Sequence, residues 1–225
     1  MKKAADFFSD DDRARINRAV ADAESQTSAE IVPVVAESSG RYDRPEDIVG
    51  LWLAVICLAI VWWMLPQPTL EPGDWSGISQ STHLVALIAA VVVGFCVGAF
   101  AGSRIPGLRR LFTPAAQMRD EVRSRARAVF FDNRVHHTAG ASGLLIYVSL
   151  FERMAAIIAD NNVLEKLGQS TLDELCARLT QSLRTSPPTD ALCEILAAAG
   201  QRLAPQLPRD SQDRNELPDA LVIID

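Results

Sequence analysis

The sequence has few of the residues and motifs that build common catalytic and metal sites. Only four of its 225 residues are cysteines, and no two of them form a CxxC pair. This usage argues against a disulfide framework and a structural zinc site, and it agrees with a reducing compartment. No glycine-rich phosphate loop, HExxH motif or glycine-flanked serine nucleophile occurs. The sequence therefore offers no catalytic set that we can name.

Charge is missing from two long apolar stretches, residues 48–65 and 83–103, which contain no Asp, Glu, Lys or Arg. Each stretch is long enough to cross the hydrocarbon core of a bilayer as a helix. The first is apolar on every face and ends with Trp62 and Trp63, where an interfacial aromatic belt is expected. A buried core helix is the alternative for this stretch. We predict an integral membrane protein with transmembrane helices over both stretches.

Small residues recur at every fourth position of the second stretch, at Ala90, Gly94, Gly98 and Gly102. This spacing places them on one helix face, where they allow a neighbouring backbone to approach closely. We expect the first stretch to be that neighbour. The alternative is homo-oligomerisation through Gly94, Gly98 and Gly102.

Basic residues flank the two stretches unequally. The connecting loop, residues 66–82, contains no Lys or Arg, and Arg41 and Arg44 precede the first stretch. Six arginines follow the second stretch: Arg104, Arg109, Arg110, Arg119, Arg123 and Arg125. By the positive-inside rule, the loop is extracytoplasmic and both termini are cytoplasmic. We therefore predict a cell-membrane protein with two spans.

Residues 114–130 resemble a basic amphipathic helix. Their arginines are candidates for binding anionic lipid or nucleic acid, or they form a solvated helix face, which is the interpretation we favour. No nucleic-acid motif and no interleaved aromatic residues accompany the charge. We therefore predict no nucleic-acid partner.

The sequence on both sides of the apolar stretches predicts strands of one sheet. Residues 30–36 are rich in β-branched side chains, although Pro33 lacks a ladder N–H group and favours an edge or bulged position. Residues 143–150 form a nearly continuous apolar run, typical of a central strand. Residues 153–159 follow after too short a link for a helical crossover, which predicts an antiparallel hairpin. Residues 30–36 have no partner before the spans, so they must pair with strands that follow them.

Apolar residues at helical spacing predict the helices of the same domain. One helix is expected to begin after Ser9, and three more are expected over residues 114–130, 171–183 and 189–203. The apolar tail 220–224 is expected to add an edge strand. We predict the α/β class: a sheet with flanking helices, built from residues 1–40 and 104–225 and interrupted by a two-helix transmembrane hairpin.

Three segments, in the order AEIVPVV, RAVFFDNRVHHTAGASGLLIYVSLFERMAAIIAD and NELPD, carry a family resemblance. The matching positions are Glu30-Ile31, Phe130, Thr138, Ser149-Leu150 with Glu152-Arg153, Ala159-Asp160 and Asn215 to Asp219. The pattern resembles the TPM domain, also known as the TPM phosphatase domain, over nearly all of the soluble sequence. The resemblance implies a three-layer domain of sheet and helices.

Relatives in the TPM family differ in biological setting. They include thylakoid lumen proteins tied to photosystem repair, described as acid phosphatases, and an accessory subunit of an acetylcholine receptor, and some bind divalent metal through acidic loops. This sequence departs from the soluble members because a membrane hairpin replaces the loop after the first strand. Any site residues that this loop carries in relatives are altered here, and fold alone does not fix function.

Asp160 is the best acidic candidate for a metal ligand. It ends a predicted strand next to Asn161 and Asn162, and Glu152, at the other end of the hairpin, is the second candidate ligand. Carboxylate oxygens suit Ca²⁺ or Mg²⁺. The alternative is that Asp160 and the asparagines make the turn through local hydrogen bonds.

Two hypotheses for function follow. The first is a non-enzymatic, membrane-anchored TPM-like domain that acts as a binding or accessory module for another membrane protein. The second is a metal-dependent phosphatase that uses Asp160 and neighbouring carboxylates. A channel or transporter is disfavoured because neither span carries an intramembrane charge.

Overall fold

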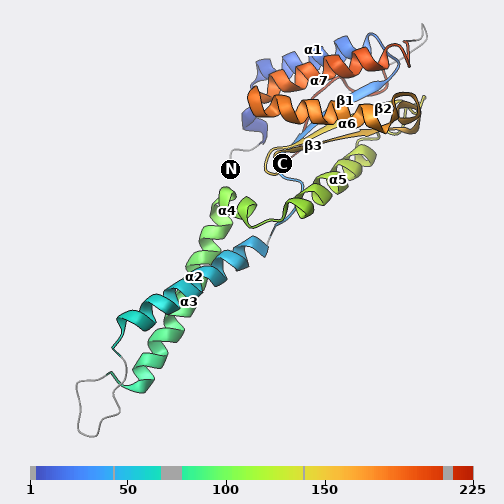
Figure 1. Ribbon diagram of the computed structural model, residues 1–225. Helices are drawn as coiled ribbons and strands as arrows, with labels where there is room; N and C mark the ends of the chain where they lie inside the picture. Colours follow the sequence, from blue (N-terminus) through green and yellow to red (C-terminus); the bar gives the residue numbers. More distant parts are fainter. Residues whose placement is uncertain (1–3, 43, 67–77, 139, 210–214, 225) are drawn as a thin grey trace, which may run out of the picture. The chain divides into compact units, whose positions relative to one another are not determined.

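The computed structural model describes residues 4–42, 44–66, 78–138, 140–209 and 215–224 (Figure 1). The chain divides into two compact units: unit 1 comprises Met1–Gly40 and Ala115–Asp225, and unit 2 comprises Arg41–Pro114. Unit 1 is therefore built from both sides of the apolar stretches. The boundary after the second stretch differs from the predicted one: residues 104–114 belong to unit 2, because the short helix they contain packs on the two long helices of that unit.

Unit 1 contains a four-stranded mixed sheet in the order β3-β2-β1-β4. Its strands are β1 (Glu30–Ala36), β2 (Gly143–Ser149), β3 (Met154–Ala159) and β4 (Val222–Ile224). β1 pairs in parallel with β2 and β4, whereas β2 and β3 form an antiparallel hairpin. The predicted pairing of the first strand with strands beyond the apolar stretches is confirmed, as are the hairpin and the C-terminal edge strand.

The predicted edge or bulged position of β1 is wrong, because β1 lies between β2 and β4 and its register with β2 is continuous. Pro33 pairs with Ile146 of β2, and the pairing with β4 begins only at Val34. Pro33, which has no N–H group, thus lies in the half of β1 that does not pair with β4. A proline is tolerated inside this sheet because one neighbouring strand is only three residues long.

In the described part of unit 1, five helical segments surround the sheet. They are η1 (Ala4–Phe7), α1 (Asp10–Glu24), α5 (Ala115–Asp132), α6 (Asn161–Thr185) and α7 (Pro188–Leu203). Figure 1 shows α1, α6 and α7 on one face of the sheet and α5 on the other. The alternate residues of β1 follow this arrangement: Ile31 and Val35 join the core under α1, α6 and α7, whereas Val32 and Val34 join the core under α5. Unit 1 is a mixed α/β domain of three layers.

Local sequence explains where several helices begin. Ser9 caps α1 as predicted: its hydroxyl accepts from the Asp12 N–H at 3.2 Å, and the Asp12 carboxylate accepts from the Ser9 N–H at 3.1 Å. α6 begins ten residues before the predicted start at 171, because Asp160 serves as its N-cap. Gly168 then breaks the helical conformation with a φ of 75°, a value that favours glycine, and the predicted segment corresponds to the part after this kink.

Unit 2 contains α2 (Arg44–Met64), α3 (Gln80–Arg104) and α4 (Pro106–Leu111). α2 and α3 are long and apolar enough to cross a membrane by length and composition, over Glu46–Met64 and Gln80–Arg104. Only 11% of each apolar window is buried inside the structure. Most of the apolar surface of these helices is therefore left exposed by the described protein. The larger part of the connecting loop, residues 67–77, lies outside the described residues.

The glycine face of α3 packs directly on α2. An ideal Cβ atom at Gly98 would lie 2.8 Å from the Gly50 Cα atom, and one at Gly94 would lie 2.9 Å from the Ala54 Cα atom. Real Cβ atoms do not approach other atoms so closely. The prediction that the first apolar stretch packs on this face is therefore confirmed. Homo-oligomerisation through Gly94, Gly98 and Gly102 would require α2 and α3 to separate.

Gly98→Val tests this close approach. The added side chain must push the two backbones apart, and overpacking of this kind costs about 1–3 kcal/mol. We expect the free energy of unfolding in mixed micelles, followed by the fluorescence of the α2 tryptophans, to fall by this amount. Gly107→Ala is the matched control, because a Cβ atom there meets nothing within 4 Å. Equal stability of Gly98→Val and the unmodified protein would contradict the packing.

Candidate functional site

Glu152 is fully buried in the turn between β2 and β3, where its carboxylate binds the segment that follows β1. The carboxylate accepts from the Ser39 N–H at 2.9 Å and from the Gly40 N–H at 3.3 Å. The Ser149 hydroxyl donates to its other oxygen. Glu152 thus fixes the path of the chain as it leaves the sheet.

Asp160 lies at the opposite end of β3, as the N-cap of α6. Its Oδ1 atom accepts from the Asn161 N–H at 2.7 Å, and its own N–H donates to the Gly143 carbonyl oxygen at 2.8 Å. Its Oδ2 atom is buried and has no hydrogen-bond partner among the residues that the structure describes. Asp160 therefore makes the local hydrogen bond that is expected of a turn residue. This role uses one of its two carboxylate oxygens.

The two predicted metal ligands do not come together. Glu152 precedes β3 and Asp160 follows it, so the six residues of the strand separate them by roughly 17–20 Å. Within the described ranges, no three His, Cys, Asp or Glu side chains are placed to share a metal ion. The arrangement therefore does not fit the Ca²⁺ or Mg²⁺ site expected at Asp160 and Glu152, because strand length keeps the two ends of a hairpin apart.

The side chains of Glu30 and Asn17 hold the C-terminal segment through its backbone N–H groups. The side chain of Glu30, at the start of β1 and only 6% exposed, accepts from the N–H groups of Glu216 at 3.1 Å and Leu217 at 3.2 Å. Further along, the Asn17 side chain of α1 accepts from the Leu221 N–H at 2.9 Å. These bonds lead the chain into β4. The NELPD motif thus acts as a latch on the first strand.

Glu24, in the last turn of α1, lies beside this latch. Its carboxylate accepts from the Ile31 N–H at 2.7 Å and interacts with the carboxyl groups of Glu30 and Asp219. Burial raises the pKa of Glu24 to about 8, and these two neighbours add to the rise, whereas the Ile31 N–H opposes it. The group lines a small cavity of about 50 Å³ together with Arg209 and with Asn215 and Asp219 of the latch. Glu24 is therefore protonated at neutral pH.

One feature of the sequence indicates this cluster. Acidic side chains are unfavourable near a helix C-terminus, yet the end of α1 carries Asp22 and Glu24 and no basic residue. A helix end of this kind indicates that the acid has a tertiary partner. The partner, Asp219, is nearly 200 residues away and could not be identified without the fold.

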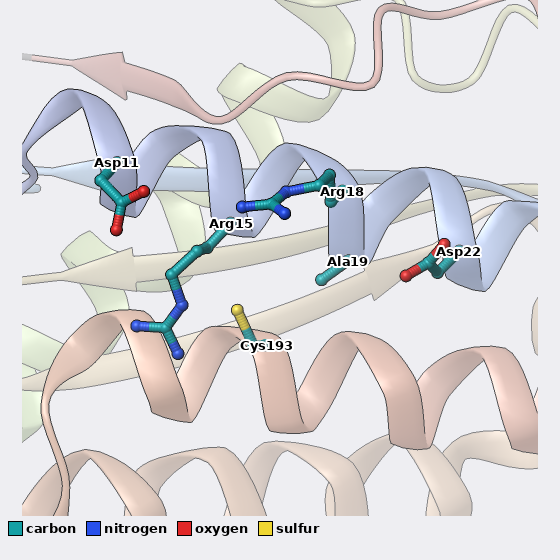
Figure 2. A pocket seen from close by; sticks show the side chains of 6 residues that line it. All are labelled: Asp11, Arg15, Arg18, Ala19, Asp22 and Cys193. Carbon is teal, nitrogen blue, oxygen red and sulfur yellow. The ribbon is translucent and has the colours of Figure 1, made fainter.

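A surface groove of about 460 Å³ runs between α1 and α7 (Figure 2). Arg15 reaches from α1 toward α7 and binds Asp190 at 2.7 Å, while Cys193 points from α7 toward α1. Burial raises the pKa of the Cys193 thiol, which disfavours the nucleophilic thiolate. Asp11, Arg18 and Asp22 also line the groove, so with Arg15 the lining has two positive and two negative charges. We interpret the groove as the site of an ion pair that links two helices, and we do not propose it as a catalytic site.

Comparison with known proteins supports the fold. No protein-family model matches the chain, and no curated protein matches it. The structure is similar to the NMR structure of BA42 protein from the psychrophilic bacterium Bizionia argentinensis, with a TM-score of 0.57, 17% sequence identity and 99% of each chain covered. At this identity, the likeness shows the fold alone.

The pKa of Glu24 predicts how stability depends on pH. Its folded-state pKa is about 8 and its ordinary value is 4.5, so the folded protein binds the extra proton between these values. The contribution of Glu24 to the free energy of unfolding is therefore largest below pH 4.5, and it is lost as the pH rises from 4.5 to about 8. The slope is at most about 1.4 kcal/mol per pH unit. Urea unfolding at several pH values should show this slope.

Glu24→Gln provides the comparison for that pH series. The amide keeps an acceptor for the Ile31 N–H but cannot ionise, so its urea midpoint should vary less between pH 5 and 8. If Glu24→Gln and the unmodified protein give the same pH profile, Glu24 does not titrate in this window.

Glu152→Ala should destabilise unit 1 by about 3 kcal/mol, because it leaves the half-buried N–H groups of residues 39 and 40 and the buried hydroxyl of Ser149 without their acceptor. Glu152→Gln retains one acceptor oxygen and should lose about half as much. The measurement is the urea midpoint by near-ultraviolet circular dichroism. A neutral effect of Glu152→Ala would show that water replaces the carboxylate.

Proposed function

We propose that this protein is a membrane-anchored, TPM-like domain that acts as a non-enzymatic binding or accessory module for a membrane protein complex. The observation that carries the proposal is the parallel pairing of β1 with β2, strands that precede and follow the two apolar helices. A domain assembled in this way needs both ends of the insertion on one side of a bilayer. Two spans meet that requirement, whereas one or three would not.

Membrane insertion is supported by the exposed surface of unit 2. The helices α2 and α3 present large side chains that are more than half exposed, such as Leu51, Trp63 and Phe100. Lipid would cover this surface, and lipid tails need no polar partner. The charge pattern supports a topology with both termini in the cytoplasm and the loop 66–82 outside the cell membrane.

A non-enzymatic role is supported by what the candidate carboxylates already do. Glu152 binds the segment after β1, Asp160 caps α6, and Glu30 holds the latch. Each contact contributes to the fold. The competing hypothesis, a metal-dependent phosphatase, is favoured by one observation, the buried Oδ2 atom of Asp160 that lacks a partner within the described part of the chain.

Two measurements on one detergent-purified sample distinguish these functions. An accessory module should retain a membrane protein in stoichiometric amount after chemical cross-linking in intact membranes, and Asp160→Ala should retain it equally. Calorimetric titration with Ca²⁺, Mg²⁺ or Mn²⁺ should give no heat that depends on Asp160, and phosphate release should equal the blank. Metal binding with turnover, both lost in a folded Asp160→Ala protein, would replace the proposal by the phosphatase.

A further inference from the structure

One end of unit 2 combines exposed apolar side chains with arginines. There α4 packs against both α2 and α3, close to the end of α3. Ile105, immediately before α4, is 50% exposed, and Leu111, its last residue, is 76% exposed. Leu108 and Phe112 are half-buried and share helical spacing with these two residues. The short helix thus has an apolar face that the described protein only partly covers.

The segment that carries this apolar face is rich in arginine and has no acidic residue in its sequence. Residues 98–114 include Arg104, Arg109 and Arg110 and contain no acidic residue. The guanidinium carbon of Arg104 lies 4.9 Å from the centroid of the Phe100 ring, one turn earlier on α3. This contact holds a cation next to the apolar surface of the helix.

Acidic residues are present at the same end, but they are fewer. Glu46 and Asp47 occupy the first turn of α2, and an ideal Cβ atom at Gly102 would lie 3.1 Å from the Glu46 Cα atom. Residues 44–47 and 98–114 together contain four arginines and two carboxylates. A net positive charge therefore remains at the end of the hairpin that carries α4.

We propose that residues 104–112 form an interfacial element that binds the headgroups of anionic phospholipids. Arg104 and Arg110 bind the lipid phosphates, because a guanidinium forms paired hydrogen bonds with phosphate oxygens. Ile105 and Leu111 enter the boundary between headgroups and acyl chains, as in other short amphipathic segments at membrane surfaces. The inference rests on the proposed function, since it requires the hairpin to be in a bilayer.

A lipid surface fits these features better than an acidic protein does. The exposed apolar residues continue the apolar surface of α3, where Phe100 is 62% exposed, without an intervening carboxylate in residues 98–114. The change from apolar surface to arginines over a few residues matches the change from acyl chains to phosphates at a bilayer surface. An acidic protein would bind the arginines but leave the apolar residues uncovered.

Native mass spectrometry of the full chain in mild detergent tests the proposal. Dioleoylphosphatidylglycerol and dioleoylphosphatidylcholine are titrated separately, and a dissociation constant is obtained for each lipid. We expect phosphatidylglycerol to bind more tightly. Each arginine near an anionic surface contributes roughly a fivefold change in affinity. Arg104→Gln with Arg110→Gln should therefore weaken phosphatidylglycerol binding roughly 25-fold and leave phosphatidylcholine binding unchanged.

Two further variants separate charge from apolar contact. Leu111→Ser should weaken the binding of both lipids to a similar extent, because it removes an apolar anchor and no charge. Arg127→Gln with Arg184→Gln removes the same number of charges from exposed positions of unit 1, and it should change neither affinity.

Equal affinities of the unmodified protein for the two lipids would overturn the inference, and so would an unchanged preference in Arg104→Gln with Arg110→Gln. Binding of a soluble acidic protein to these arginines, without a lipid preference, would do the same. Alkaline carbonate extraction tests the underlying function independently. Release of the protein by carbonate would contradict the proposed membrane anchoring. Retention of the protein without a lipid preference would contradict only the present inference.

Discussion

The parallel pairing of β1 with β2 is the constraint on which the rest of the structure depends. The register runs from Glu30 opposite Gly143 to Ala36 opposite Ser149, so about 106 residues of chain lie between the paired strands. Closing a flexible connection of that length has a substantial entropic cost. The antiparallel helices of unit 2 reduce it, because Gly102 near the end of α3 lies against Glu46 near the start of α2. The insertion therefore returns the chain close to the point where it left.

The buried polar groups of unit 1 secure the same arrangement. Glu152 binds the chain just after β1, and Glu30 at the other end of β1 binds the C-terminal segment. The first strand is thus fixed at both ends by carboxylates that accept backbone N–H groups. Such groups are costly to leave unpaired in a protein interior. The candidate metal ligand Glu152 belongs to this framework, which explains its complete burial.

Much of the fold could be predicted from the sequence because its signals are local. The apolar run 143–150, the capping residue Ser9 and the four-residue spacing of the α3 glycines each identify an element without reference to the rest of the chain. The sequence does not indicate the start of α6, because Asp160 and the asparagines after it are equally typical of a turn. The pairing of Glu24 with Asp219 and the separation of Asp160 from Glu152 depend on the three-dimensional path of the chain, and no local pattern encodes either.

The distance in sequence between β1 and β2 has a consequence during synthesis. At 5–20 residues per second, the ribosome needs roughly 5–20 s to complete the chain between the two strands. During this interval β1, with the sequence EIVPVVA, has only a single charged residue and none of its eventual neighbours in the sheet. Exposed strands of this composition are templates for pairing with other chains. Pro33 interrupts the row of N–H donors, so it acts as a gatekeeper that protects the nascent protein while its partner strand is still being made.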